Sequence, residues 1–470
     1  MNPISIHTSI KKRWAAPGGY REVLVVAFPL ILSTGSWSVQ HFFNRIFLTW
    51  YAPDAVAAAM PAGMVNYALL CLFLGTVGYV GIFAAQYFGA GQEGKVGRVM
   101  WQSLWMALAG GLLCLATAPC AEKFFAAVGH QPAVQRHETI FYVILCYGAL
   151  PALVSAAFAG VLSGLGRTVP VMWVTFGAAA LNVLLDWLLI FGRAGFPGMG
   201  IAGAGWANNI ANLASAAAFA AVIFGPGLRR RFRMLDWRPE RRLLSRLLAY
   251  GLPSGIQFFI DMAGFTVFIL LVGRLGTTDL AASTIAFNIN TLAFMPMIGI
   301  GITVSVLVGQ FVGRGDPAGA RLAVRSAFEM TFSYMALVAG LFFFAPGMFL
   351  APFAAQSDPA SFAAIAGIAA VLLRFVAVYT LFDGLNIVFS SAIKGAGDTR
   401  FVMAMIGAMS VGILIVPSYI AVMVLHVNIY ACWGIATAYV IALGLAFWLR
   451  YKSGVWERMR VIEPVLSEGA

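Results

Sequence analysis

The sequence predicts an all-α polytopic membrane protein with twelve transmembrane helices, and two observations carry this prediction. The first is composition: 61% of the 470 residues are hydrophobic and only 10% are charged, which is too apolar for ordinary soluble domains. The second is that the apolar residues form long runs, each near the roughly 20 residues that span a hydrocarbon core. Runs without apolar/polar alternation are typical of helices and not of barrel strands.

The apolar runs place the helices in order along the chain. The first run follows a basic, polar segment and has no small-residue cleavage site, so we expect it to remain as the first helix and not to be removed as a signal peptide. The expected spans are residues 22–44, 62–86, 99–120, 139–163, 169–191, 200–224, 247–273, 284–312, 327–350, 361–393, 402–424 and 429–450.

The basic residues predict the orientation in the membrane. Most of the 30 Lys and Arg residues fall in the loops of one side, and the positive-inside rule makes that side cytoplasmic, with both termini. We therefore expect a multi-pass protein of the cytoplasmic (inner) membrane, in contact with the lipid bilayer. This topology and contact with anionic lipid account for the net charge of +12, so no nucleic-acid partner is expected.

The chain is predicted to consist of two similar halves. A polar stretch with eight arginines, from Gly225 to Arg246, separates six expected helices from the next six. The expected segments are a cytoplasmic N-terminal segment (1–21), an N-terminal six-helix lobe (22–224), a basic cytoplasmic linker (225–246), a C-terminal six-helix lobe (247–450) and a cytoplasmic tail (451–470).

Short motifs recur in the same order in both halves, which indicates a parallel duplication. Transporters commonly use such repeats, because two similar bundles can rock about a site at their interface and give alternating access. The recurring pairs are Gln86-x-x-Gly89 with Gln310-x-x-Gly313, Gly164-Leu-Gly166-Arg-Thr168 with Gly395-Ala-Gly397-Asp-Thr399, and Gly200-Ile201-Ala202 with Gly434-Ile435-Ala436.

Three aspartates lie within the apolar runs. Asp186 shares a helix face with Asn182, Asp383 shares one with Tyr379, and Asp261 lies in the seventh run. A charge at this depth costs at least about 2.5–3.5 kcal/mol and commonly marks an ion or substrate path. A structural role, as a hydrogen-bonded contact between helices, is the alternative. We favour function for Asp261 and Asp383 and leave both interpretations open for Asp186, near the outer end of its helix.

Buried carboxylates suit an exporter because several cations compete for them. A bare anion is unfavourable away from water, so such a group seeks a proton, a sodium ion or a cationic substrate. An ion that enters from outside can then displace a cationic drug. Aromatic side chains, 13% of the residues, add apolar and cation–π surface for varied ligands.

Several motifs resemble those of the multidrug and toxic compound extrusion (MATE) family, in its NorM-like bacterial branch. The resemblance covers about residues 20–450 and implies two six-helix lobes and export of mostly cationic, aromatic compounds driven by protons or sodium. The motifs are Leu162-Ser-Gly-Leu-Gly-Arg-Thr-Val-Pro170, Leu181-Asn-Val-Leu-Leu-Asp-Trp-Leu-Leu-Ile-Phe-Gly192, Pro197-Gly-Met-Gly-Ile-Ala-Gly-Ala204, Gly276-Thr-Thr-Asp-Leu-Ala-Ala282 and Lys394-Gly-Ala-Gly-Asp-Thr-Arg400.

The resemblance implies a cation-coupling site in the C-terminal lobe. Asp261 looks like the acidic residue of helix seven, usually Glu in the sodium-coupled branch. Asp383 looks like the helix-ten aspartate, and Tyr379 like the aromatic partner of the cation. Asp261 and Asp383 would then be the Na⁺ ligands. Apart from Na⁺ or H⁺ as the coupling ion, no cofactor is expected.

The resemblance also implies a polar site in the N-terminal cavity, formed by Asn44, Asn182, Asp186 and Asn208. Two of these residues depart from the family pattern: Asn44 stands where an Asp is usual, and Asn208 where a Thr is frequent. Asparagine does not titrate but still offers a carbonyl oxygen to sodium. The C-terminal lobe is therefore the preferred coupling site, and we expect a monomer that transports cationic drugs.

Three other functions are open to a polytopic membrane protein. A lipid-linked oligosaccharide flippase of the same superfamily would need a basic cavity, whereas the candidate residues here are acidic. A membrane-embedded enzyme would need a nucleophile or a metal cluster near the membrane surface, and the sequence shows neither pattern. A passive channel would carry flux that does not depend on an opposing ion gradient. The sequence thus predicts an antiporter and not an enzyme.

Overall fold

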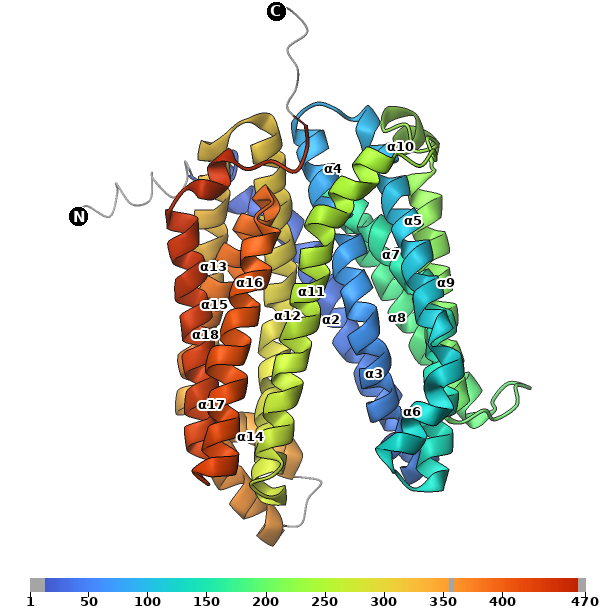
Figure 1. Cartoon of the computed structure of the whole chain (residues 1–470), viewed down its shortest axis with the longest axis vertical. Coiled ribbons are helices and arrows are strands. Elements are labelled where there is room, and N and C mark those ends of the chain that lie inside the picture. Colours follow the sequence, from blue (N-terminus) through green and yellow to red (C-terminus); the bar gives the residue numbers. More distant parts are fainter. Residues whose placement is uncertain (1–12, 355–358, 464–470) are drawn as a thin grey trace, which may run out of the picture. The chain divides into compact units, whose positions relative to one another are not determined.

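The computed structural model describes residues 13–354 and 359–463, and within these ranges it contains helices and no strand. Twelve helices among the described residues are long and apolar enough to cross a membrane, which confirms the predicted fold class (Figure 1). The spans are Tyr20–Tyr51, Ala57–Gly89, Gly94–Val128, Pro132–Gly164, Thr168–Phe191, Ile201–Ile223, Arg241–Val272, Thr277–Arg314, Pro317–Phe344, Phe362–Ala396, Thr399–Val424 and Ile429–Lys452.

The chain folds into two compact units. We call N-unit the one formed by Val26–Phe259, Gly309–Gly315 and the described residues from Arg460 onward. Its helices are α2 (Tyr20–Tyr51, from Val26), α3 (Pro53–Gly78), α4 (Val80–Gly89), α5 (Gly94–Ala116), η1 (Ala118–Cys120), α6 (Ala121–Val128), α7 (Pro132–Gly164), α8 (Thr168–Phe191), α9 (Ile201–Ile223), α10 (Pro226–Arg231) and the first part of α11 (Arg241–Val272).

The other unit, here the C-unit, contains the described residues up to Val25, Ile260–Val308 and Asp316–Met459. The segment boundaries expected from the sequence stay predictions. The helices of the C-unit are the rest of α11, most of α12 (Thr277–Arg314), α13 (Pro317–Phe344), α14 (Pro346–Ala354), α15 (Pro359–Ala396), α16 (Thr399–Met409), η2 (Ser410–Ile415), α17 (Val416–Tyr419), η3 (Ile420–Val424), α18 (Ile429–Lys452) and η4 (Val455–Arg458).

Helix ends follow local sequence rules. Pro132 and Pro317 stand at the starts of α7 and α13, where the missing N–H of proline has no intrahelical partner in any case. The Asp316 side chain caps α13 by accepting from the Gly319 N–H at 2.9 Å. Gly192 ends α8 in a left-handed conformation at φ 68°, which glycine adopts without a steric penalty.

The eleventh span departs from the single regular helix expected over residues 402–424. Two π-helical segments, η2 and η3, interrupt it on either side of α17. Pro417 lies in α17, and its missing N–H removes one bond of the regular i→i−4 pattern. The wider π turns accommodate that gap.

The duplication predicted from the motifs is seen in the packing. In the N-unit the fourth span, α7, packs against the third and sixth spans, α5 and α9. In the C-unit the fourth span of the second half, α15, packs against α13 and α18, which are again the third and sixth. The same helix pairs therefore build both cores.

One repeated glycine makes the same close contact in both halves. A Cβ on Gly164 of α7 would overlap the carbonyl oxygen of Gly81 on α4. A Cβ on Gly395 of α15 would lie 2.5 Å from the carbonyl oxygen of Ser305 on α12. The Ser305 hydroxyl also donates to the Ser391 carbonyl at 2.8 Å. Small residues let membrane helices approach this closely.

The two Gln-x-x-Gly motifs pack against each other within the N-unit. A Cβ on Gly89 would overlap the carbonyl oxygen of Gln310, and a Cβ on Gly313 would overlap that of Gln86. The contact is therefore reciprocal, as expected for two copies of one motif. The Gln310 side chain adds a hydrogen bond to the Gly164 carbonyl at 2.8 Å.

The C-terminal segment packs against the region of the Gln86 motif. The Gln86 Oε1 accepts a hydrogen bond from the backbone N–H of Val461 at 2.9 Å, and Val461 is fully buried. The Glu463 carboxylate lies 3.4 Å from Arg246 and 3.7 Å from Lys95. The last described residues thus bind α4, α5 and α11.

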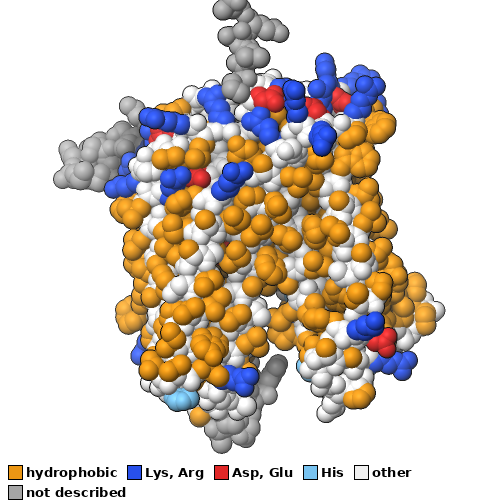
Figure 2. Space-filling view, in the orientation of Figure 1, with side chains coloured by type: hydrophobic (Ala, Val, Ile, Leu, Met, Phe, Trp, Pro, Cys, Tyr) orange, Lys and Arg blue, Asp and Glu red, His pale blue; other side chains and the backbone are white. Residues whose placement is uncertain are grey.

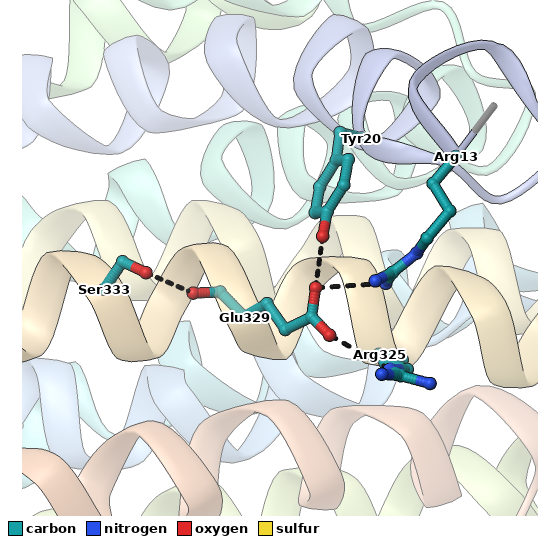
Figure 3. A network of polar contacts seen from close by, with 5 residues as sticks. All are labelled: Arg13, Tyr20, Arg325, Glu329 and Ser333. Carbon is teal, nitrogen blue, oxygen red and sulfur yellow. Dashed lines mark hydrogen bonds and ion pairs between the residues drawn. The ribbon is translucent and has the colours of Figure 1, made fainter. Parts of the chain in front are cut away.

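The start of α2 is held in the C-unit by Glu329 of α13 (Figure 3). The Glu329 carboxylate accepts a hydrogen bond from the Tyr20 hydroxyl. It also pairs with Arg13 at 3.0 Å and with Arg325, one helical turn earlier, at 3.0 Å. The first helix therefore begins in one unit and continues in the other.

We expect Gly89→Ala to lower the free energy of unfolding by about 1–3 kcal/mol, because the added methyl group meets a backbone carbonyl that cannot rotate away. The measurement is the temperature at which the detergent-solubilised protein loses its monodisperse gel-filtration peak. The control is Gly177→Ala in α8, where a Cβ meets nothing within 4 Å. Equal melting temperatures for the two variants would contradict the close contact.

Candidate functional site

The residues predicted for a polar site in the N-terminal lobe lie in the N-unit. Asp186 is fully buried in α8. Its Oδ2 accepts a hydrogen bond from the Asn44 amide of α2 at 3.2 Å. In the amide orientation that satisfies its neighbours, Asn182 also donates to Asp186 Oδ2, at 3.1 Å. Asp186 Oδ1 is buried and makes no hydrogen bond within the described part of the chain.

Two further residues close this network. The Asn182 carbonyl oxygen accepts from the backbone N–H of Asn208 at 3.1 Å. The Gln40 amide, one turn before Asn44, lies 3.5 Å from the Asn208 side-chain oxygen. Three helices, α2, α8 and α9, thus contribute to one set of side chains. The structure brings together all four residues that were predicted for this site.

The chemistry of this set is that of one carboxylate among neutral amides. Two amide N–H groups stabilise one oxygen of Asp186 when it is ionised, whereas the other oxygen has no donor. A buried anion without a counter-charge is unfavourable. The free oxygen of Asp186 can therefore take a proton or a cation, and the amide oxygens nearby are hard ligands of the kind that sodium prefers.

The expected site of the C-terminal lobe centres on α15. Asp383 is 9% exposed and Tyr379, one turn earlier, is 5% exposed. The Asn386 amide donates to Asp383 Oδ1 at 3.1 Å. Tyr379 and Asp383 lie on one face of α15, as four-residue spacing requires.

Asp261 on α11 lies close enough to Asp383 for their charges to interact. The ammonium group of Lys394, further along α15, also lies within the electrostatic reach of Asp261. Tyr439 of α18 is 2% exposed and lies within the range of electrostatic interaction with both aspartates. The C-unit thus gathers Asp261, Tyr379 and Asp383 in one region, together with a lysine and a second tyrosine.

The sequence did not single out Gln40, Asn386, Lys394 and Tyr439. Gln40 and Asn386 have the spacing that could have revealed them, because each lies one turn from a predicted site residue on the same helix. Lys394 follows the expected tenth span, residues 361–393, whereas it lies within α15. Tyr439 gave no signal, since it stands in an apolar run far from the other residues of the set.

No group of three or more His, Cys, Asp or Glu side chains with a geometry for a metal ion occurs between residues 13 and 463, outside the 355–358 gap. Such clusters hold transition metals. A sodium site differs, because it uses carboxylate, carbonyl and hydroxyl oxygens. In the C-unit, Asp261, Asp383 and Tyr379 can supply such oxygens.

Comparison with known proteins places this arrangement in a family. The MatE family profile matches residues 29–188 and 253–420. The chain is 31% identical to a probable multidrug resistance protein NorM of Bradyrhizobium diazoefficiens over 82% of each chain. It is 30% identical to another of Xanthomonas campestris pv. campestris, over 81% of this chain and 82% of the relative.

Solved structures share the fold. A multidrug resistance MATE family transporter of the MOP superfamily in an outward-facing conformation superposes with a TM-score of 0.85 at 18% identity, over 96% of this chain and 99% of that one. A MOP superfamily transporter from Pyrococcus furiosus, described as having a binding pocket of reverse polarity, gives a TM-score of 0.83 at 19% identity over the same shares.

The fold, the duplicated motifs, the family match and the relatives agree on a multi-pass membrane transporter and not an enzyme. The chain therefore belongs to the MatE family of multidrug and toxic compound extrusion transporters, in its NorM-like bacterial branch.

Proposed function

We propose that this transporter exports cationic, aromatic compounds in exchange for Na⁺ that moves inward, and that Asp261 and Asp383 form the coupling site. The proposal rests on three ionisable side chains of α11 and α15: Asp383 is buried with one amide donor on its Oδ1, and Asp261 lies within the range of charge interaction with Asp383 and with the Lys394 ammonium group. When all three are ionised, one negative charge remains uncompensated. The site is then balanced by one monovalent cation, which can be the ion or the drug.

Sodium suits this site because its neighbours supply oxygen atoms. Two carboxylates are hard ligands, and the Tyr379 hydroxyl or ring, one turn from Asp383, adds a further contact. A proton can compete for the same oxygens. We favour Na⁺ because the N-unit lacks the acid of the first helix that would make a pair of titratable groups there: Asn44 stands beside Asp186.

The N-unit set is proposed as a second polar site that influences transport without setting the main driving force. Its Asp186 has one oxygen available for a proton. The named residues of the two sets together hold three aspartates and one lysine. This acidic balance favours cationic substrates and disfavours the anionic cargo of a lipid-linked oligosaccharide flippase.

The exchange is expected to follow the sodium concentration difference. Moving one charge through 100 mV is worth about 2.3 kcal/mol, but a one-for-one exchange of Na⁺ for a monovalent cation moves no net charge. The energy of such a cycle comes from the sodium gradient alone. We further propose that the protein lies in the inner membrane with both termini in the cytoplasm, on the basis of the excess of basic residues in the loops of one side. The expected monomeric state is part of the same proposal but does not rest on this charge distribution.

Asp383→Asn is expected to reduce drug efflux at least about tenfold, because loss of a charge contact worth roughly 1.4 kcal/mol already changes an affinity tenfold. Expression and membrane insertion should stay normal, since the substitution preserves side-chain volume. Resistance to ethidium in cells and the amount of protein in membranes are the two measurements. Glu122→Gln, an exposed carboxylate of α6, is the control. Normal efflux by Asp383→Asn would exclude this coupling site.

Asn44→Asp is expected to change the pH dependence of transport more than its sodium dependence. The Asn44 amide lies 3.2 Å from the Asp186 carboxylate, so the substitution creates a pair of neighbouring carboxylates. Such a pair shares a proton, which raises the pKa of one of its members. Efflux should therefore be measured from pH 6 to 9 at fixed sodium. Asn44→Gln keeps the amide and serves as the control. An unchanged pH profile in the Asp variant would show that the N-unit site takes no part in transport.

An inward sodium gradient is expected to start efflux of ethidium from proteoliposomes at clamped pH and voltage, and an equal potassium gradient is not. The reason is the single uncompensated charge of the C-unit site, which an inward-moving sodium ion neutralises as the drug leaves. Full efflux driven by a proton gradient in sodium-free buffer, with no added effect of sodium, would overturn the choice of ion. The exporter assignment would survive that result.

A further inference from the structure

The segment between α10 and α11 is not a loose connection. The indole N–H of Trp101 donates to the Met234 carbonyl at 2.8 Å, and that of Trp105 donates to the Trp237 carbonyl at 3.2 Å. Both tryptophans belong to α5. We call residues 228–240 the docked linker, because these bonds attach its backbone to the side of a transmembrane helix.

Further bonds continue the attachment at both ends of the docked linker. The N–H of Gly97 donates to the Phe232 carbonyl at 3.0 Å. The fully buried Gln102 side chain donates to the Arg238 carbonyl at 3.1 Å and accepts from the Glu240 N–H at 3.1 Å. Each of these partners on α5 lies inside the candidate membrane span Gly94–Val128.

The attachment gives the docked linker a depth in the membrane. The contacts on α5 extend from Gly97 to Trp105, which at 1.5 Å per residue is about 12 Å along the helix axis. The polar headgroup region of one leaflet is thinner than this distance. If α5 enters the membrane near its start, as its apolar span indicates, the docked linker runs alongside the region where lipid headgroups lie.

Two large apolar side chains of the docked linker face outward at this depth. Leu235 is 59% exposed and Trp237 is 57% exposed, whereas the neighbouring Phe232 and Met234 are buried. Alternation along the backbone thus turns one set of side chains to the N-unit and the other set away from it. Tryptophan in such a position is typical of the membrane interface.

Arginines surround these apolar side chains. Arg231 forms two bonds to Glu93, of 2.7 and 2.5 Å, and these bonds hold the pKa of Glu93 below its usual range. The other arginines around it are exposed and make no ion pair with a described carboxylate. They are Arg229, Arg230, Arg233, Arg238, Arg241 and Arg242. Figure 2 shows blue side chains gathered at the end of the N-unit that carries α10.

We propose that the docked linker is a binding site for anionic phospholipid headgroups. The guanidinium groups of Arg230, Arg233 and Arg238 contact lipid phosphates, for which their planar donors are suited. Leu235 and Trp237 lie just below them, at the upper ends of the acyl chains. This combination of a basic rim, an interfacial tryptophan and a backbone fixed at headgroup depth fits a lipid surface better than a soluble anion.

The test uses the full-length protein in nanodiscs that contain phosphatidylglycerol or phosphatidylcholine, each brominated at the upper acyl chain. Bromine quenches nearby tryptophans, and the difference between the natural protein and Trp237→Phe isolates the signal of Trp237. We expect stronger quenching of Trp237 by brominated phosphatidylglycerol. Joint replacement of Arg230, Arg233 and Arg238 by Gln should abolish this preference. Each arginine is expected to contribute roughly fivefold to the affinity for the anionic lipid at low salt.

Matched controls make the outcome decisive. Arg136, Arg193 and Arg274 are exposed arginines outside the docked linker, so their joint replacement by Gln removes the same charge and should leave the preference intact. About 0.5 M NaCl should weaken the preference for phosphatidylglycerol in the natural protein through screening, whereas millimolar inorganic phosphate should not compete.

Equal quenching by the two lipids, or an unchanged preference in the linker variant, would overturn the proposal. Competition by inorganic phosphate would identify a soluble-anion site instead, and absence of any Trp237 quenching would place the segment against water or another protein.

Discussion

The absence of water in the hydrocarbon core is the constraint on which this structure depends. Backbone groups that cannot bond to water must bond within the chain, so every span is a helix. The same constraint applies to side chains. Asp186 is fully buried and keeps two amide donors on one oxygen, while Asp383 keeps one. The incompletely compensated carboxylates are those to which we assign cation exchange in the proposed function.

Close helix contacts in lipid depend on small residues, because hydrophobic burial gives no advantage between surfaces that are both already in hydrocarbon. The duplicated glycines supply these contacts. Gly164 and Gly395 bring α7 onto α4 and α15 onto α12, respectively. Where one copy has Gly81, the other has Ser305, whose hydroxyl bonds to a carbonyl of the neighbouring helix. The duplicated plan is thus kept by geometry and not by identical residues.

The fold was predictable because apolar length and repeated motifs are local properties of the sequence. The number of spans and the pairing of the halves needed no knowledge of contacts. Site residues could be proposed when they shared a helix face, as Asn182 and Asp186 do, or when they stood at a polar position of the family pattern, as Asn44 and Asn208 do although each differs from the residue usual there. Lys394 could not be proposed, because its neighbour Asp261 lies on another helix. The course of the docked linker was also not predictable, because its partners lie on another helix. The sequence shows the arginines of the linker, but it does not show that the indole groups of α5 bond to the linker backbone.

The hydrogen bond between Tyr20 and Glu329 joins residues that are 309 positions apart, which has a consequence for biosynthesis. At roughly 5–20 residues per second, the ribosome needs on the order of 15–60 s after making the first helix before its partner on α13 exists. The bond between Val461 and Gln86 joins residues 375 positions apart and must wait longer still. During this interval the first helix is in the bilayer while the Tyr20 hydroxyl still lacks its hydrogen-bond partner Glu329. Assembly of the newborn chain therefore includes contacts that form only after Val461 has been synthesised, so the first half is made early but acquires its last contacts late.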